Sequence, residues 1–366
     1  MPPGERLREL LDEKGWTQEE LAQITGRSRQ QIIDLLNNQR GISPEMAVAL
    51  GTAFKTTAEY WMKLDADHRL SQVREDAVAV TLRLRIFEFA PIKEMQRRGW
   101  IKDTKNVAEI QEELERFFRI ESLDQVPQFP LAMRRSASLD DLTPAQRAWC
   151  FRARQLAEAL HVPTFEPTRV GELKRKLRAL AAYPAEASKV SDLMRSYGIR
   201  FVVVEPLAGA KIDGAAFWIG DSPVVAVSLR YDRIDYFWFT LMHEVAHIEN
   251  GDGLSVDTDL AVEEREQPLM KAAAERRADE LAAAALVPPE EMDSFIRRVG
   301  PMYARPNIIQ FAHRIKIHPG IIVGQLQHRA EMGFGANRQL LPKIREHVVS
   351  TALADGWGND ISPGSV

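Results

Sequence analysis

A chain of 366 residues is long enough for two or three domains, each with its own hydrophobic core. The formal net charge of −4 excludes an overall basic field, so any contact with DNA must be local. The single cysteine, Cys150, excludes an intramolecular disulfide framework, and no stretch approaches the roughly 18 apolar residues of a membrane span. We therefore expect a cytoplasmic protein with no membrane partner.

The first 70 residues predict a succession of short helices with clear start and stop signals. Thr17 with Glu20 three residues later forms a capping-box pattern, and Ser28 is a good N-cap for the helix that follows. Gly26 stands in the short turn between these two helices, a spacing typical of a helix-turn-helix. The segment therefore predicts a five-helix DNA-binding domain over residues 1–70.

Recognition helices contact bases with their N-terminal residues, and flanking arginines suit phosphates. The residues expected to contact DNA are Arg27, Ser28, Arg29, Gln30, Gln31 and Arg40. Around this helix the only acidic residue is Asp34, which favours specific docking by a homodimer but weak non-specific binding. Use of the motif for protein contacts alone is the alternative.

Residues 28–47, SRQQIIDLLNNQRGISPEMA, resemble the Xre/Cro class of regulators. The resemblance is strongest to the HigA-type antitoxins, whose pattern S-R-Q-x-I-x-x-I-L-N-G-x-R-G-I-[ST]-P-E-M-A is nearly reproduced. It implies that the partner is operator DNA.

The middle of the chain predicts amphipathic helices, and we expect residues 71–169 to form a helical connector. Its best linker candidate is residues 123–142. Cys150 lies within one of these helices and is interpreted as a packing residue, with a nucleophile as the remote alternative. No internal repeat is present.

The periodicity then changes to short β-branched or aromatic runs separated by Gly, Asp and Pro. Three strands of a small sheet are predicted at residues 199–207, 214–220 and 222–230. Helical periodicity returns at residues 233–250 and 266–288. The predicted fold class is therefore mostly α with a small α+β part.

Two histidines four residues apart, His243 and His247, lie on the first of these helices with Glu244 directly after His243. Residues four apart lie one above the other, so both imidazoles can bind one ion. Glu244 projects about 100° away, where it can hold a metal-bound water without being a ligand. Two partly buried structural histidines are the alternative, although a chain of this composition contains H-E-x-x-H by chance only on the order of 1% of the time.

A third ligand must come from another element. Glu275 and Asp279 lie one turn apart on the alanine-rich helix predicted for residues 266–288, whose small side chains allow close approach of a second helix. Glu275 is the expected ligand, and Asp279 can accept a hydrogen bond from the second nitrogen of a ligand imidazole. Weaker ligand candidates are Glu249, Asp252 and Glu280.

The pairing of FTLMHEVAHIENG with ERRADELAAAALVP resembles the ImmA/IrrE family of bacterial metallopeptidases. By position, the resemblance implies the Zn²⁺ ligands His243, His247 and Glu275, the catalytic glutamate Glu244, and Asp279 at the Asn/Asp position of the second motif. Val245 and Val287 depart from the usual Leu and Leu or Met, but neither position carries the chemistry.

The resemblance covers roughly residues 170 to 330 and implies a zincin-like α+β domain; several family members cleave a DNA-bound repressor. We place this domain at residues 170–335 and a C-terminal tail at residues 336–366. The two motifs contain no donor for the oxyanion of the transition state. His318 is the first candidate for that catalytic role, followed by Tyr231 and His313.

These observations predict a DNA-binding regulator with a zinc endopeptidase domain that cuts a regulatory protein, such as a repressor or a toxin–antitoxin partner. A competing hypothesis is a HigA-like antitoxin or repressor whose peptidase-like domain senses a signal or binds a toxin without proteolysis.

Overall fold

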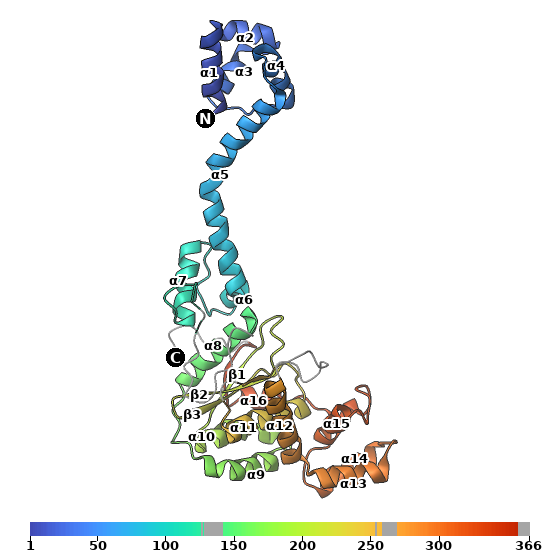
Figure 1. Cartoon of the computed structure of the whole chain (residues 1–366). Helices are drawn as coiled ribbons and strands as arrows, with labels where there is room; N and C mark the ends of the chain where they lie inside the picture. The colour runs from blue at the N-terminus through green and yellow to red at the C-terminus, as the bar shows by residue number, and fades with distance from the viewer. Residues whose placement is uncertain (126, 128–141, 253–254, 258–268, 358–366) are drawn as a thin grey trace. The chain divides into compact units, whose positions relative to one another are not determined.

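The computed structural model describes the whole chain except residues 126, 128–141, 253–254, 258–268 and 358–366 (Figure 1). The chain divides into two compact units, Met1–Leu84 and Arg85–Val366. Most of the linker candidate at residues 123–142 and the end of the predicted tail lie outside the described residues. No described helix combines the length and the apolar character that crossing a membrane requires.

The first unit contains the first four of the five helices expected from the sequence and most of the fifth, whose last residues belong to the second unit. They are α1 (Pro3–Lys14), α2 (Gln18–Thr25), α3 (Arg29–Leu36), α4 (Pro44–Phe54) and α5 (Ala58–Phe89). The helix α5 is longer than the sequence segment suggested, because neither glycine nor proline interrupts it before Pro91. The core of the first unit includes the fully buried side chains of Leu21, Ile32, Leu50 and Trp61.

The predicted caps fix the geometry of the helix-turn-helix. The backbone N–H of Glu20 donates to Thr17 Oγ1 at 3.2 Å, and the N–H of Thr17 donates to the Glu20 carboxylate at 2.7 Å. Gly26 ends α2 in the left-handed conformation with φ 64°, which glycine adopts without steric cost. Ser28 then caps α3 by accepting from the N–H of Gln31 at 3.3 Å.

The second unit contains the remaining described helices. The α-helices are α6 (Ile92–Arg97), α7 (Val107–Phe118), α8 (Pro144–Glu158), α9 (Val170–Leu180), α10 (Val190–Ser196), α11 (Ile234–Asn250), α12 (Leu269–Leu286), α13 (Pro289–Val299), α14 (Arg305–Arg314), α15 (Pro319–His328) and α16 (Arg345–Val349). Three short 3₁₀ helices are η2 (Pro167–Arg169), η3 (Pro184–Lys189) and η4 (Arg338–Leu340).

A mixed sheet of five described strands lies in this unit, in the order β4-β2-β3-β1-β5. Its strands are β1 (Arg200–Val204), β2 (Gly214–Ile219), β3 (Ser222–Val227), β4 (Ser255–Asp257) and β5 (Leu353–Asp355). The three predicted strands are confirmed. The other two have three residues each, too few to give a readable alternation.

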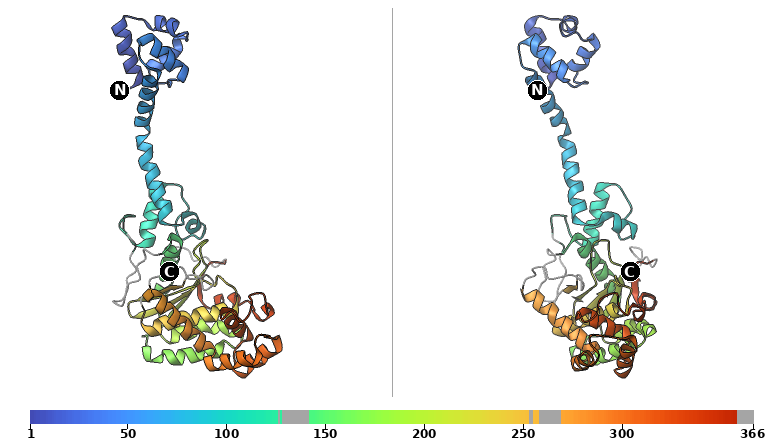
Figure 2. Two further views of the ribbon diagram at one scale, coloured as in Figure 1. Left: turned by 45° about the vertical axis from the view of Figure 1, so that its right-hand side comes forward. Right: turned by 90° about the vertical axis from the view of Figure 1, so that its right-hand side faces the viewer.

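Helices cover both faces of the sheet. Figures 1 and 2 show α8 on one face and α9, α11 and α12 on the other. On the latter face, Phe201 and Val203 of β1 share a core with Leu241 and Val245 of α11. This packing explains the apolar stripe of α11 and fixes which of its side chains face the sheet.

The end of the described chain contributes to this core. Strand β5 pairs parallel to β1. The fully buried Asp355 accepts a hydrogen bond from Trp100 Nε1 at 3.3 Å and forms an ion pair with Arg152 of α8. Arg98, next to α6, donates to the backbone carbonyl of Glu205 at 2.6 Å. The segment after Arg85, which the sequence places in the connector, therefore packs on the sheet.

Candidate metal centre and DNA-binding surface

Helices α11 and α12 bring His243, His247 and Glu275 together. The two Nε2 atoms of the histidines are 3.0 Å apart, and Glu275 Oε2 lies 3.1 Å from His243 Nε2 and 3.4 Å from His247 Nε2. Both imidazoles are 1% exposed. Within the part of the chain that the structure describes, these residues form the one group of three His, Cys, Asp or Glu able to hold a metal ion.

The opposite nitrogen of each imidazole faces a carboxylate. His243 Nδ1 lies 2.9 Å from Asp279 Oδ1, and His247 Nδ1 lies 2.9 Å from Asp252 Oδ2. A carboxylate accepts hydrogen bonds, so it favours the tautomer that carries the proton on Nδ1. Both Nε2 atoms then direct lone pairs toward Glu275. The two nitrogens and the carboxylate oxygen are all hydrogen-bond acceptors, and a group of acceptors that face one another suits a cation as their common partner.

The spacing of these atoms fits zinc. A tetrahedral ion with bonds of about 2.0–2.1 Å separates two ligand atoms by about 3.3 Å. The three separations of 3.0, 3.1 and 3.4 Å lie close to this value. Two histidines and one glutamate are a protein ligand set found in catalytic zinc sites, whereas structural zinc sites are usually closed by four protein ligands.

The electrostatics of the group also favour a cation. Burial raises the pKa of the Glu275 carboxyl, but the neighbouring imidazoles of His243 and His247 outweigh burial and hold it well below its ordinary value. Burial lowers the pKa of the His247 imidazole, but Glu275 and the charge of Glu244 outweigh that effect and raise it. Both shifts show that the carboxylates stabilise positive charge at this point.

Glu244 is fully buried beside strand β2. A Cβ added at Gly214 would come within 2.5 Å of Glu244 Oε1, so only glycine permits this approach of the carboxylate to the strand. Gly214 is the first residue of β2 and pairs with Val227 of β3, so its position is fixed by the sheet. The carboxylate is therefore held next to the histidines by the fold rather than by a flexible loop.

Asp252 has a clearer role in the structure than the sequence suggested. Gly251 ends α11 with φ 68°, and the N–H of Asp252 then donates to the backbone carbonyl of His247 at 3.0 Å. This turn brings the Asp252 side chain back to the His247 imidazole. A glycine followed by an aspartate directly after the helix was the available signal.

The structure does not bring His318 to the metal centre. It is the N-cap of α15, where Nδ1 accepts from the N–H of Gly320 at 3.0 Å, and burial lowers its pKa. A Cβ at Gly320 would touch Ile234, so the start of α15 lies beside Ile234. Ile234 precedes His243 by nine residues, which corresponds to about 13 Å along α11.

The two other oxyanion candidates do not belong to the group of three ligand residues. Tyr231 stacks on Tyr236 with ring centroids 4.4 Å apart and accepts from Arg230 at 2.7 Å. His313 is exposed on α14 beside Ile309. Tyr231 lies nearer the site, because it borders a small pocket with Thr240, one turn before Glu244.

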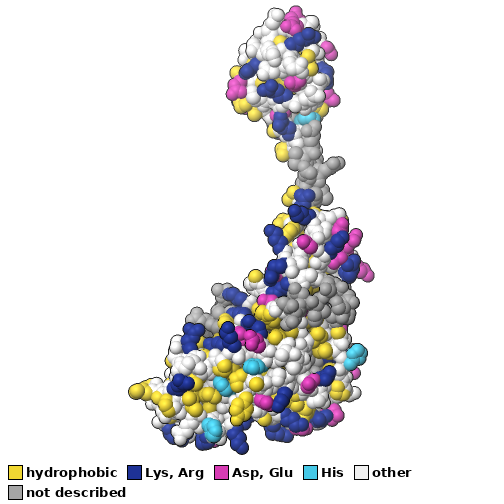
Figure 3. Space-filling model, turned by 180° about the vertical axis from the view of Figure 1, so that it is seen from behind, with side chains coloured by type: hydrophobic (Ala, Val, Ile, Leu, Met, Phe, Trp, Pro, Cys, Tyr) yellow, Lys and Arg dark blue, Asp and Glu magenta, His cyan; other side chains and the backbone are white. Residues whose placement is uncertain are grey.

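In the first unit, Ser28, Arg29, Gln30 and Arg40 are exposed, whereas Arg27 and Gln31 are half-buried. The amide oxygen of Gln31 accepts from the N–H of Ser28 at 3.2 Å, so this side chain completes the cap of α3. Gln30 donates to Asp34 at 2.8 Å. Figure 3 shows basic and acidic side chains interspersed on the visible face of this unit, which agrees with local rather than global attraction to DNA.

Each unit contains a segment that matches a known family model. Residues 7–61 match the helix-turn-helix family model, and residues 195–331 match the model of the IrrE N-terminal-like domain, a peptidase family. The chain therefore combines an Xre-type helix-turn-helix domain with a metallopeptidase-like domain of the IrrE/ImmA type.

The chain is also 36% identical over 74 residues to virulence-associated protein A' of Dichelobacter nodosus. That match spans 20% of this chain and 64% of the relative, just under two thirds of its length. No solved structure matches the chain. The two domain matches support a role as a DNA-binding regulator.

Proposed function

We propose that this protein is a DNA-binding transcriptional regulator whose second unit is a zinc-dependent endopeptidase that cuts a regulatory protein. The observation that carries the proposal is the convergence of two imidazole nitrogens and one carboxylate oxygen within 3.4 Å, with the buried Glu244 beside them. A purely structural role would not explain a second buried carboxylate next to this group, because burying an ionised carboxylate is costly.

Each residue has a separate task in this proposal. His243, His247 and Glu275 hold zinc, which when bound lowers the pKa of a water and polarises the carbonyl of the bond that is cut. Glu244 takes the proton from the attacking water and passes it to the leaving amine. Asp279 and Asp252 keep the imidazoles in the ligating tautomer.

The helix-turn-helix places this chemistry near DNA. Arg29 and Gln30 lie at the exposed start of α3. Arginine can bind guanine or a phosphate, and glutamine can bind adenine. We infer that a homodimer places these residues on two half-sites of the operator. We infer that the substrate is a regulatory protein that acts at the same operator, such as a repressor or a toxin–antitoxin partner.

A second function is favoured by the HigA-like sequence of α3 and α4, since such a domain alone can repress transcription. In that case the zinc domain would sense a signal or bind a toxin without cutting. The substitution Glu244→Gln separates the two, because glutamine preserves the shape of the side chain but cannot accept the proton. If the protein is a peptidase, this variant keeps its zinc and its DNA binding but loses its regulatory output in cells.

Matched variants test whether a lost regulatory output results from loss of the zinc site. His247→Ala and Glu275→Ala should purify without zinc, whereas Glu280→Ala, an exposed position on the same helix as Glu275, should retain about one zinc per chain. A stable, zinc-loaded Glu244→Gln protein with wild-type output would contradict the peptidase function and leave the binding function.

A further inference from the structure

A pocket lies one helical turn from the proposed metal centre, in the crease between α11 and α12. Phe239, four residues before His243, lines it from α11, and Ala283, four residues after Asp279, lines it from α12. The ring of Phe239 lies 6.3 Å from the imidazole of His243 and 5.9 Å from that of His328 on α15. The pocket therefore lies beside the site, between α15 and the two helices that hold the ligands.

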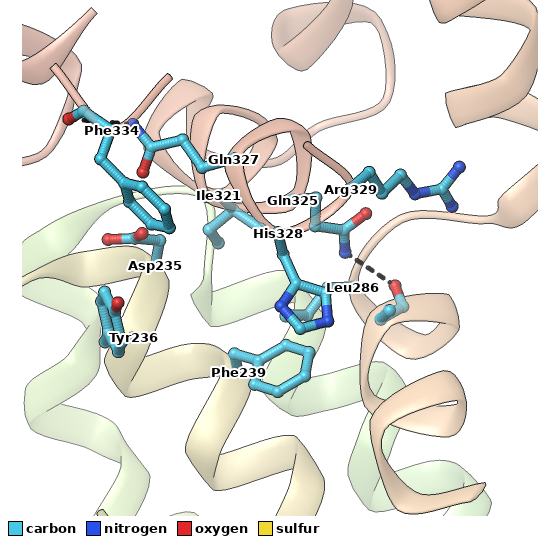
Figure 4. A pocket seen from close by; sticks show the side chains of 12 residues that line it. Asp235, Tyr236, Phe239, Leu286, Ile321, Gln325, Gln327, His328, Arg329 and Phe334 are labelled. Carbon is cyan, nitrogen blue, oxygen red and sulfur yellow. Dashed lines mark hydrogen bonds between the residues drawn. The ribbon is translucent and has the colours of Figure 1, made fainter. Parts of the chain in front are cut away.

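The walls of this pocket are mainly apolar. Figure 4 shows Phe239 next to His328, with Asp235, Tyr236 and Phe334 facing them across the pocket. The apolar lining comes from Phe239, Ala283, Leu286, Ile321 and Phe334. The pocket encloses about 80 Å³, whereas one water needs roughly 10–15 Å³, so a large side chain fits.

The charged groups of the pocket are already paired inside the protein. The carboxylate of Asp235 accepts from Arg233 at 2.7 and 3.1 Å, and Arg329 donates to Asp293 at 2.7 Å. Asp235 and Arg329 therefore do not favour a charged ligand, and the apolar walls determine which side chain the pocket binds.

One polar atom of the pocket differs from these. The amide nitrogen of Gln325 donates to the backbone carbonyl of Ala283 at 2.9 Å, which fixes the orientation of the amide. Its Oε1 is buried, in a residue that is 6% exposed, and finds no hydrogen-bond partner among the described residues. Because this oxygen is not accessible from the pocket, Gln325 contributes to the pocket through the hydrogen bond that fixes its amide and not as an acceptor for a ligand.

We propose that this pocket receives a large apolar or aromatic side chain of the polypeptide substrate, next to the bond that is cut. The proposal rests on the proposed function, since it assigns specificity to the same zinc site.

The test uses the full-length, zinc-loaded protein and two small hydroxamates, those of glycine and phenylalanine, whose head group chelates zinc. Calorimetry should show that phenylalanine hydroxamate binds about 10- to 100-fold more tightly than glycine hydroxamate, the gain expected from burial of one large apolar side chain.

The substitution Ala283→Leu fills the pocket and should reduce this preference to less than about threefold, with zinc content and glycine hydroxamate binding unchanged. Ala273→Leu, which adds the same side chain at an exposed position of α12, should preserve the preference. Phe334→Ala gives a second variant at a side chain that is 61% exposed, so its fold is not at risk; it should weaken phenylalanine hydroxamate alone.

Equal binding of glycine and phenylalanine hydroxamates to the wild type would overturn the pocket proposal while leaving the zinc site intact. Absence of zinc and of all hydroxamate binding would instead overturn the proposed function, and the pocket proposal with it.

Discussion

Removal of the carboxylates behind the imidazoles should weaken zinc binding without removing a ligand. Asp279 Oδ1 and Asp252 Oδ2 each lie 2.9 Å from an Nδ1 atom, one on His243 and one on His247. Loss of such a partner typically costs 10- to 100-fold in metal affinity, which is about 1.4–2.7 kcal/mol. Their side chains are 32% and 33% exposed, so water replaces part of the interaction and the lower end of this range is expected.

The dissociation constant of zinc can be measured by competition with a fluorescent chelator for Asp279→Ala, Asp252→Ala and the double variant. Both imidazoles face the same ion position, so the two effects are coupled, and the double variant should lose more affinity than either single variant. Glu280→Ala, an exposed neighbour on α12, should bind zinc like the wild type. Wild-type affinity in both single variants would refute the argument that these carboxylates set the tautomers.

Three further predictions concern other parts of the chain. Asp355→Asn should lower the free energy of unfolding by about 3–5 kcal/mol in urea titrations, because it removes the carboxylate that faces the buried guanidinium of Arg152, whose side chain is 4% exposed. Gln30→Ala should cost about 1–3 kcal/mol in binding to the specific operator, measured by fluorescence anisotropy. Gly214→Ala should reduce kcat by about 10-fold or more in a cleavage assay, because the added Cβ displaces the carboxylate of Glu244.

Each of these three has a control. Glu186→Gln, which breaks an exposed ion pair with Lys189, should change stability by less than about 1 kcal/mol, and an equal effect for Asp355→Asn would contradict the buried-charge argument. Random DNA should bind the Gln30→Ala variant almost normally, and an equal loss would mean that Gln30 does not read bases. Unchanged kcat in a zinc-loaded Gly214→Ala protein would show that the strand does not position Glu244.

The sequence predicted those features of the site that depend on local spacing. Two histidines four residues apart lie on the same face of α11, and Glu275 and Asp279, one turn apart, lie on the same face of α12. The site then requires only that these two helices pack against each other. The three central strands and the capped helix-turn-helix were predictable for the same reason, because periodicity and capping are local signals.

Features that depend on contacts between distant segments could not be predicted. Asp252 meets His247 through a turn closed by Gly251, and Asp355 meets Arg152 through a three-residue strand at the far end of the chain. His318 illustrates a different case, since a histidine directly before a helix suits both catalysis and capping. The hydrogen bond from Gly320 shows that it caps.

The measurement that tests the central claim most directly is a mass-spectrometric comparison of protein N termini in cells that carry either the wild-type chain or Glu244→Gln. We predict at least one new N terminus, within a regulatory protein, that is present with the wild type and absent with the variant, since loss of a general base costs about 10²–10⁴-fold in rate. Identical sets of N termini in the two strains, with both proteins folded and zinc-loaded, would contradict the assignment of this domain as a peptidase.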